Sequence, residues 1–146
     1  MIRRADIIAA ARECLDTKFH HQGRLVGVGI DCIGVMVHPA KRLGIPHIDC
    51  TTYRARPDGI TLIPHLERNL ERIAVGEARP GDVLCFWWVR PNLPHHLGLL
   101  TDRGLLHAYA GVRKVVEHEL TDDWRERIHS AWRYRGVEPW QQSDSL

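Results

Sequence analysis

The sequence of 146 residues predicts an α+β fold in which N-terminal helices pack on an antiparallel β-sheet. Apolar residues recur at helical spacing in the first half of the chain. From residue 79 onward, turn residues alternate with short apolar runs that are typical of strands. The composition, 44% hydrophobic and 26% charged, is that of a globular domain. We therefore expect one domain over residues 1–140 and a disordered tail over 141–146.

The first predicted helix runs from about Arg4 to Asp16. Its apolar residues share one face at helical spacing, and they are Ile7, Ile8, Ala11, Cys14 and Leu15. The segment 18–29 that follows is rich in glycine and histidine, so we expect a loop that leads the chain to Cys32.

Cys32 lies where this loop becomes a second helix. Asp31 is a good N-cap residue, the apolar run after Cys32 favours a buried helix, and Gly44 is a candidate C-cap. Pro39 lies inside this helix and removes one backbone hydrogen bond. That loss costs about 3 kcal/mol and predicts either a bend or a shorter helix.

A cysteine in the first turn of a helix is a candidate nucleophile. The unpaired amides and the positive end of the helix dipole favour an anion, so we expect a lowered pKa for Cys32. The alternative is that Cys32 is an inert packing residue, as we expect for Cys14, Cys50 and Cys85. No C-x-x-C motif is present, which indicates that all four are free thiols.

An irregular stretch from Pro46 to Ile60 precedes another amphipathic helix. The apolar face of this predicted helix consists of Leu62, Leu66, Leu70 and Ile73, and its solvent face of Glu67, Arg68 and Glu71.

The second half of the chain predicts a β-meander. Residues 79–82 form a turn before an apolar strand over 83–89, which is typical of a central strand covered on both faces. Trp87 and Trp88 would lie on its opposite faces, and we expect most of the five tryptophans in the core. The remaining predicted elements are a hairpin of 96–100 and 105–110, a strand over 114–117, a short helix that begins at 121–124, and a last strand over 132–134.

Two histidines stand out because of the hairpin register. If the hairpin closes symmetrically across residues 101–104, His96 and His107 become diagonal neighbours on one face, with Cα atoms roughly 7–8 Å apart. Gly98 leaves room between them, whereas His95 points to the opposite face. With Cys32 nearby, His96 could act as the base and His107 could orient it. The alternative is that each is a structural residue of its strand.

Charge and spacing argue against several classes of partner. The formal net charge of +2 indicates neither a nucleic-acid nor a membrane partner. No H-E-x-x-H motif occurs, so we expect no metal and no cofactor. The pairs His20–His21 and His118–His129 are predicted to be solvated surface. No secretion signal or membrane span is recognisable, which predicts a protein that is cytoplasmic at synthesis.

Four motifs resemble those of the NlpC-type cysteine peptidases, the NlpC and p-sixty family, and the resemblance covers nearly the whole chain. They are Asp31-Cys32-x-Gly34, Pro80-Gly81-Asp82, His96-Leu97-Gly98 and His107-Ala108. The resemblance implies a compact papain-like fold. It also implies cleavage of the bond between γ-D-glutamate and a diamino acid in peptidoglycan stem peptides. Carried over by motif, Cys32 is the nucleophile, His96 the base and His107 the third, orienting residue.

Within this family the chain is most similar to phage tail-associated peptidases, including those of gene transfer agents. The features are Gly23-Arg24 before Gly29-x-Asp31-Cys32, and Tyr53-Arg54-x-Arg56-Pro57 after the helix. This similarity implies assembly with other tail proteins in a virion.

The chain departs from the family at two positions. Ile33 replaces a usual serine, and Phe19 replaces a tyrosine near the active site. Asp31, Phe19 and His20 are candidate substrate-binding residues by the same resemblance. Two alternatives stay open: an inactive tail component with this fold, favoured by Phe19, and another thiol enzyme such as an acyltransferase or amidase.

Overall fold

The computed structural model describes residues 1–55 and 60–141, and its architecture is the expected α+β arrangement. The helices are α1 (Arg4–Arg12), α2 (Cys32–Leu43), α3 (Leu62–Asn69) and α4 (Asp122–Glu126), with the 3₁₀ helix η1 (Val75–Glu77). The strands are β1 (Arg24–Leu25), β2 (Gly29–Ile30), β3 (Leu70–Ile73), β4 (Val83–Trp87), β5 (Pro94–Thr101), β6 (Gly104–Tyr109), β7 (Lys114–His118) and β8 (Ile128–Tyr134). Arg56, Pro57 and residues 142–146 of the expected tail lie outside the described residues.

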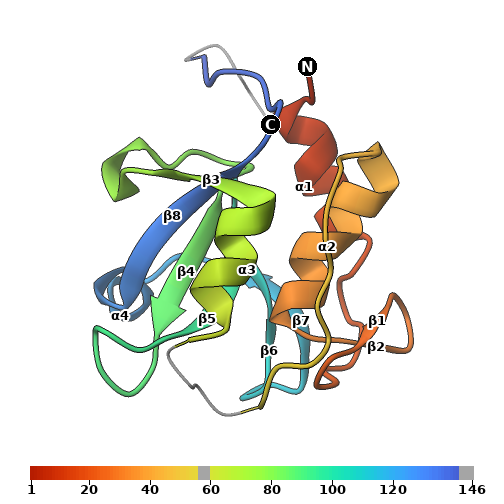
Figure 1. The fold of residues 1–146 in the computed structure, drawn as a ribbon, viewed down its shortest axis with the longest axis vertical. Coiled ribbons are helices and arrows are strands. Elements are labelled where there is room, and N and C mark those ends of the chain that lie inside the picture. The colour runs from red at the N-terminus through yellow and green to blue at the C-terminus, as the bar shows by residue number, and fades with distance from the viewer. Residues whose placement is uncertain (56–59, 142–146) are drawn as a thin grey trace.

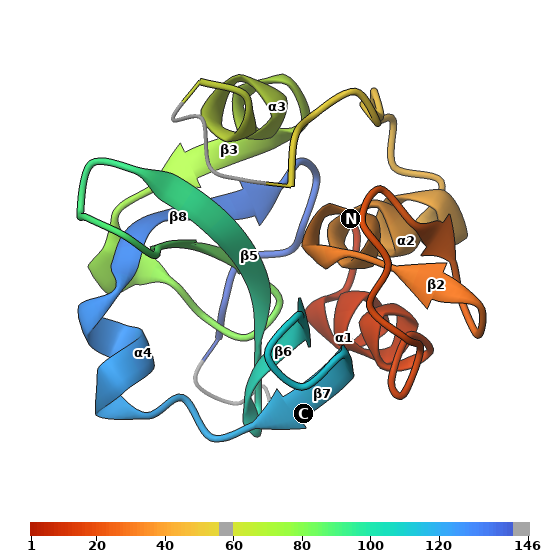
Figure 2. The ribbon, with the colours of Figure 1, turned by 90° about the horizontal axis from the view of Figure 1, so that it is seen from below.

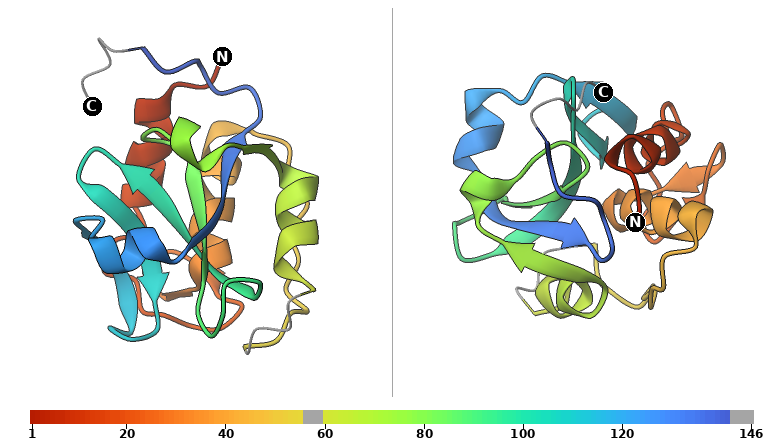
Figure 3. Two further views of the ribbon diagram at one scale, coloured as in Figure 1. Left: turned by 90° about the vertical axis from the view of Figure 1, so that its left-hand side faces the viewer. Right: turned by 90° about the horizontal axis from the view of Figure 1, so that it is seen from above.

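Six strands form one antiparallel sheet in the order β3-β8-β4-β5-β6-β7 (Figure 1). The expected meander is present as β4 to β7, and β8 returns to pair between β3 and β4. Helices α1 and α2 lie side by side against one face of the sheet, as Figure 2 and Figure 3 show. No helix in the described part of the chain has the length and apolarity to cross a bilayer.

Strand β4 is covered on both faces, as its apolar sequence predicted. Val83 and Cys85 belong to the main core beneath the helices, whereas Leu84 and Phe86 belong to a smaller cluster on the other face. The smaller cluster includes the half-buried Trp124 of α4. This alternation places both faces of β4 away from water, and the free energy of the fold rests largely on the burial of such residues.

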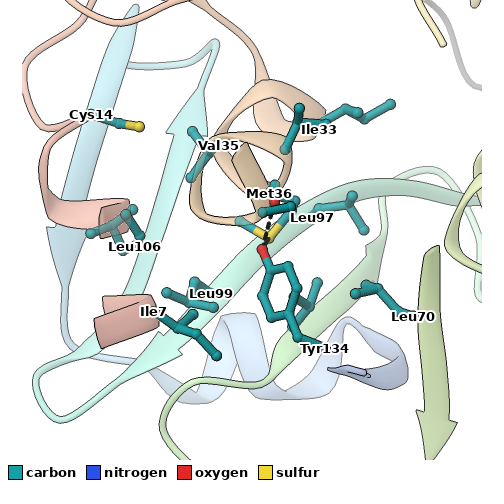
Figure 4. Close-up of a cluster of buried hydrophobic side chains, with 14 of the residues drawn as sticks. Ile7, Cys14, Ile33, Val35, Met36, Leu70, Leu97, Leu99, Leu106 and Tyr134 are labelled. Carbon is teal, nitrogen blue, oxygen red and sulfur yellow. Dashed lines mark hydrogen bonds between the residues drawn. The ribbon is translucent and has the colours of Figure 1, made fainter. Parts of the chain in front are cut away.

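Helix α2 begins and ends where its capping residues predicted. The Asp31 carboxylate accepts a hydrogen bond from the Gly34 amide at 2.9 Å, and Gly44 ends the helix with φ of 69°. The helix continues past Pro39, which excludes the shorter helix that this proline allowed. Figure 4 shows the buried hydroxyl of Tyr134 on β8 donating to the Met36 carbonyl at 2.6 Å, which attaches α2 to the sheet.

The expected helix did not extend over residues 70–73. Leu70 and Ile73 do not continue the helix of Leu62 and Leu66, because residues 70–73 pair with β8 and form the edge strand β3. Pairing with β8 satisfies the backbone of this segment and overrides its helical spacing.

The tryptophans were also placed wrongly. Trp132 alone among them is buried in the described residues, whereas Trp87, Trp88, Trp124 and Trp140 are half-buried. Strand β4 ends at Trp87, so Trp88 belongs to the following loop and the two are not opposite residues of one strand.

An ion-pair network links α1, β4 and β8 at a fully buried carboxylate. Asp82 accepts from Arg4 Nη1 at 3.1 Å and from Arg133 Nη2 at 2.8 Å, and its Oδ2 also accepts from the Arg79 amide. The Arg4 side chain is itself 1% exposed. The Pro80-Gly81-Asp82 motif is therefore the point at which the first helix is tied to the sheet.

Candidate active site

Cys32 and His96 line one open cleft of about 820 Å³ between α2 and the end of the sheet. Cys32 is the first residue of α2, held there by the Asp31 cap. A backbone hydrogen bond from Leu97, the residue after His96, favours the Cys32 thiolate and places its sulfur against β5. The structure thus brings the predicted nucleophile and the predicted base to the same cavity.

The pKa of Cys32 is raised to about 12, chiefly by burial and secondly by the neighbouring Asp31 carboxylate. The lowered pKa expected from the helix N-terminus was therefore wrong. Burial outweighs the helix dipole, since the dipole contributes at most about 2 kcal/mol. In the free protein Cys32 is a neutral thiol, so its activation requires a base.

Iodoacetamide at pH 7 should label Cys50 before Cys32. Cys50 is half-buried, and hydrogen bonds from Thr52 lower its pKa, whereas the pKa of Cys32 is raised. Peptide mass spectrometry over a time course measures both rates. Faster alkylation of Cys32 than of Cys50 would show that the Cys32 thiolate forms without substrate, and would contradict the raised pKa of Cys32. Cys50 was expected to be a packing residue like Cys14 and Cys85, but it is half-buried whereas those two are buried.

The two histidines singled out by the hairpin register are in contact. Leu100 pairs with Leu105, as symmetrical closure requires, and His96 Nε2 lies 2.7 Å from His107 Nδ1. A Cβ added at Gly98 would clash with Leu105 Cδ1 but would lie 3.4 Å from the His107 Cβ, which is ordinary contact, so the glycine makes room for Leu105 and not, as expected, for the two rings. The bond occupies Nε2 of His96 and leaves Nδ1 as the nitrogen that can take a proton from Cys32.

A third histidine extends this pair. His107 Nε2 lies 2.8 Å from His118 Nε2, and His118 Nδ1 lies 2.8 Å from the carbonyl oxygen of Glu119. The expectation that His118 is solvated surface was wrong. Because His118 pairs with Leu105 across β6 and β7, it is the diagonal neighbour of His107 on the same face. The predicted strand over 114–117 stops one residue short of His118. A strand extended by that residue would have placed His118 beside His107 by the same pairing rule that placed His96 there.

Aromatic side chains enclose the histidines. The Trp88 ring stacks on His96 with 5.4 Å between centroids, and Tyr109 stacks on His107 at 5.3 Å. Trp124 meets His107 edge-on at 4.9 Å. Burial lowers the pKa of His96 well below 6.5 and that of His107 to about 3, with a further lowering by the adjacent histidine in each case. Both rings are neutral at pH 7.

The free energy of unfolding should fall as the pH is lowered from 7 to 5. The unfolded chain protonates His96 and His107 near pH 6.5, whereas the folded protein does so only at much lower pH. Each depressed pKa therefore lowers stability by about 1–2 kcal/mol over this range. Urea denaturation at several pH values measures how steeply the free energy of unfolding falls with decreasing pH. This slope should be smaller in His107→Gln than in the wild type. An equal slope in both proteins would show that His107 titrates normally.

Asp31 is the centre of a network below Cys32. Its carboxylate accepts hydrogen bonds from Arg24 Nη1 at 2.9 Å, from the backbone amide of Gln22 at 2.8 Å and from the hydroxyl of Tyr53. It also accepts the capping bond from the backbone amide of Gly34. Burial and the Asp31 carboxylate raise the pKa of Tyr53, so its hydroxyl remains a donor. The network joins the loop before α2 to the segment after it.

The other candidate substrate-binding residues lie differently. Phe19 lines the cleft with Cys32, whereas His20 is exposed and contacts the His21 carbonyl instead. Tyr53 and Arg54 also line the cleft. In residues 1–55 and 60–141, no three His, Cys, Asp or Glu side chains converge in a way that could hold a metal ion.

The fold and the cleft define an α+β domain of the papain-like kind, with a cysteine at a helix N-terminus and a histidine on the adjoining sheet. Among solved structures, it superposes on an NlpC/P60 family protein from Bacillus cereus with a TM-score of 0.69 and 22% identity. The alignment covers 90% of this chain and 40% of that one. The domain therefore has the NlpC/P60 fold that its motifs indicated.

Other solved structures agree. The NlpC/p60 domain of the peptidoglycan hydrolase SagA matches with a TM-score of 0.63 and 22% identity, over 90% of this chain and 98% of that domain. A lipoprotein-like NLP/P60 family protein from Staphylococcus aureus matches with a TM-score of 0.66 and 16% identity, over 90% and 41%. The chain thus spans less than half the length of the Bacillus and Staphylococcus proteins. No family model and no curated protein matches the sequence.

Proposed function

We propose that the protein is a cysteine peptidase that hydrolyses the bond between γ-D-glutamate and a diamino acid in peptidoglycan stem peptides. The observation that carries this proposal is that His96, which lines the same cleft as Cys32, lies 2.7 Å from the buried His107. Likeness to a domain described as part of a peptidoglycan hydrolase supports the substrate class.

The chemistry follows from the protonation states. His96 Nδ1 takes the proton from Cys32 Sγ, and the thiolate attacks the carbonyl carbon of the scissile amide. The Cys32 amide in the first turn of α2 is one donor to the oxyanion. His96 then returns the proton to the leaving amine, and water hydrolyses the thioester. Because the thiol is neutral at rest, His96 is essential to the first step.

Mass spectrometry of muropeptides incubated with the protein and with Cys32→Ala tests this function. The wild type should release fragments that end in γ-D-glutamate, and the variant should release none. Cleavage at a different bond would overturn the substrate assignment. Intact muropeptides in both samples would favour the inactive tail component instead.

We further propose that the protein acts as a phage tail-associated cell wall hydrolase. Residues of the two motifs that suggested this subtype contact each other, since Arg24 and Tyr53 share the Asp31 carboxylate, and the Arg24 guanidinium lies 5.6 Å from the Tyr53 ring centroid. Proteomic analysis of phage particles purified from the source bacterium tests the role. Recovery with tail proteins is expected, and its absence from intact particles would contradict it.

A further inference from the structure

We propose that His118 is a positioning residue. Together with the carbonyl of Glu119, it sets the tautomers of His107 and His96 so that the unprotonated nitrogen of His96 is Nδ1. The role of His96 as base rests on the proposed function, whereas the tautomers are properties of the free protein. The two can therefore be tested separately.

A backbone carbonyl fixes the tautomer of His118. His118 Nδ1 lies 2.8 Å from the Glu119 carbonyl oxygen, which can only accept, so Nδ1 carries the hydrogen. When His118 is neutral, its imidazole has one N–H, and Nε2 of His118 is therefore an acceptor. Its neighbour at 2.8 Å is His107 Nε2, which must donate.

The tautomer of His118 in turn determines those of His107 and His96. Since His107 is neutral and donates through Nε2, its Nδ1 is an acceptor. His96 Nε2, 2.7 Å away, must then donate, and the lone pair of His96 is left on Nδ1. One bond from His118 to a backbone carbonyl and two ring-to-ring bonds thus determine which nitrogen of His96 carries the hydrogen.

Packing holds the rings in this order. His107 is fully buried and packs against both the Tyr109 and the Trp124 rings, and the Trp124 ring also lies 6.0 Å from His118. His118 is the last residue of β7, paired with Leu105. The backbone register therefore fixes the distance that the bond between His107 and His118 needs.

The tautomers of His107 and His96 can be reversed together by changing residue 118, and the test uses this property. A donor at the position of His118 Nε2 would force His107 Nε2 to accept and His107 Nδ1 to donate. His96 Nε2 would then accept, and the hydrogen would lie on Nδ1, where it blocks uptake of the thiol proton. His118→Lys offers only donors at this position, whereas His118→Gln offers a side-chain oxygen that accepts.

The experiment is a long-range ¹H–¹⁵N NMR correlation of the imidazole nitrogens at pH 7, which distinguishes a protonated from a bare nitrogen. In the wild type, His96 and His107 should show bare Nδ1, and His118 should show bare Nε2. His118→Gln should keep the pattern of His96 and His107, and His118→Lys should reverse it. A wild-type His96 with protonated Nδ1 would overturn the proposal, whether or not the protein cleaves peptidoglycan.

Activity provides the second readout. His118→Lys should lower kcat by about 10²- to 10⁴-fold, the range for loss of a correctly oriented base, with little change in KM. His118→Gln should stay within about threefold of wild type. The matched control is His47→Gln, which removes a histidine whose Nδ1 also contacts a backbone carbonyl but which lies outside the cleft. Equal loss in the Gln and Lys variants would show that His118 acts only through packing.

Discussion

His96→Ala should lower kcat/KM for stem-peptide hydrolysis at pH 7 by about 10³- to 10⁴-fold. The reason is the neutral resting state of the nucleophile. With the pKa of Cys32 raised to about 12 by burial and by Asp31, the thiol loses its proton only to a base inside the cleft. We propose His96 as that base, because its buried ring is neutral and its Nε2 is already bonded to His107.

The loss should be in kcat with KM nearly unchanged, because His96 acts on the proton of the thiol and contributes little to ground-state binding. Assays of defined stem peptides over a range of concentrations separate the two parameters. His47→Ala is the control, and circular dichroism checks that both variants fold. A loss below about tenfold would show that another group takes the proton, and would remove His96 from the mechanism.

Asp82→Ala should lower the free energy of unfolding by about 3–5 kcal/mol, a large fraction of the roughly 5–15 kcal/mol that stabilises an ordinary domain. The variant leaves the Arg4 guanidinium buried at 1% exposure without its carboxylate, and Arg133 loses two hydrogen bonds. The Arg79 amide also loses its acceptor. An unpaired buried charge costs far more than the net worth of the pair, so the effect is expected to be large.

Urea denaturation monitored by tryptophan fluorescence measures this change. Asp6→Ala is the matched control, since it breaks an exposed i,i+3 pair with Arg3 that spans 4.0 Å and is worth under about 1 kcal/mol. Similar losses in the two variants would show that the network around Asp82 contributes no more than a surface ion pair.

Local signals predicted most of the fold. Capping residues predicted both ends of α2, because Asp31 and Gly44 act through their own backbone neighbours. The contact of His96 with His107 followed from a short turn, which sets the register of the whole hairpin. These features depend on residues near one another in the chain, which is why periodicity and turn chemistry predicted them.

Features that depend on tertiary contacts could not be predicted in this way. Residues 70–73 have helical spacing, and only pairing with β8 makes them a strand. The pKa of Cys32 depends on how deeply the cleft buries it. Tyr53 reaches Asp31 from 22 residues away through an irregular segment, and no pattern in the sequence indicates that path.

The most direct test of the central claim is intact-mass spectrometry of the protein, acid-quenched during turnover of a stem peptide that contains γ-D-glutamate. We expect a thioester adduct with the mass of the γ-D-glutamyl fragment. Digestion should place it on the peptide that contains Cys32, and Cys32→Ser should show no such thioester. Product formation by Cys32→Ala, or an adduct on any other residue, would contradict the assignment of Cys32 as the nucleophile.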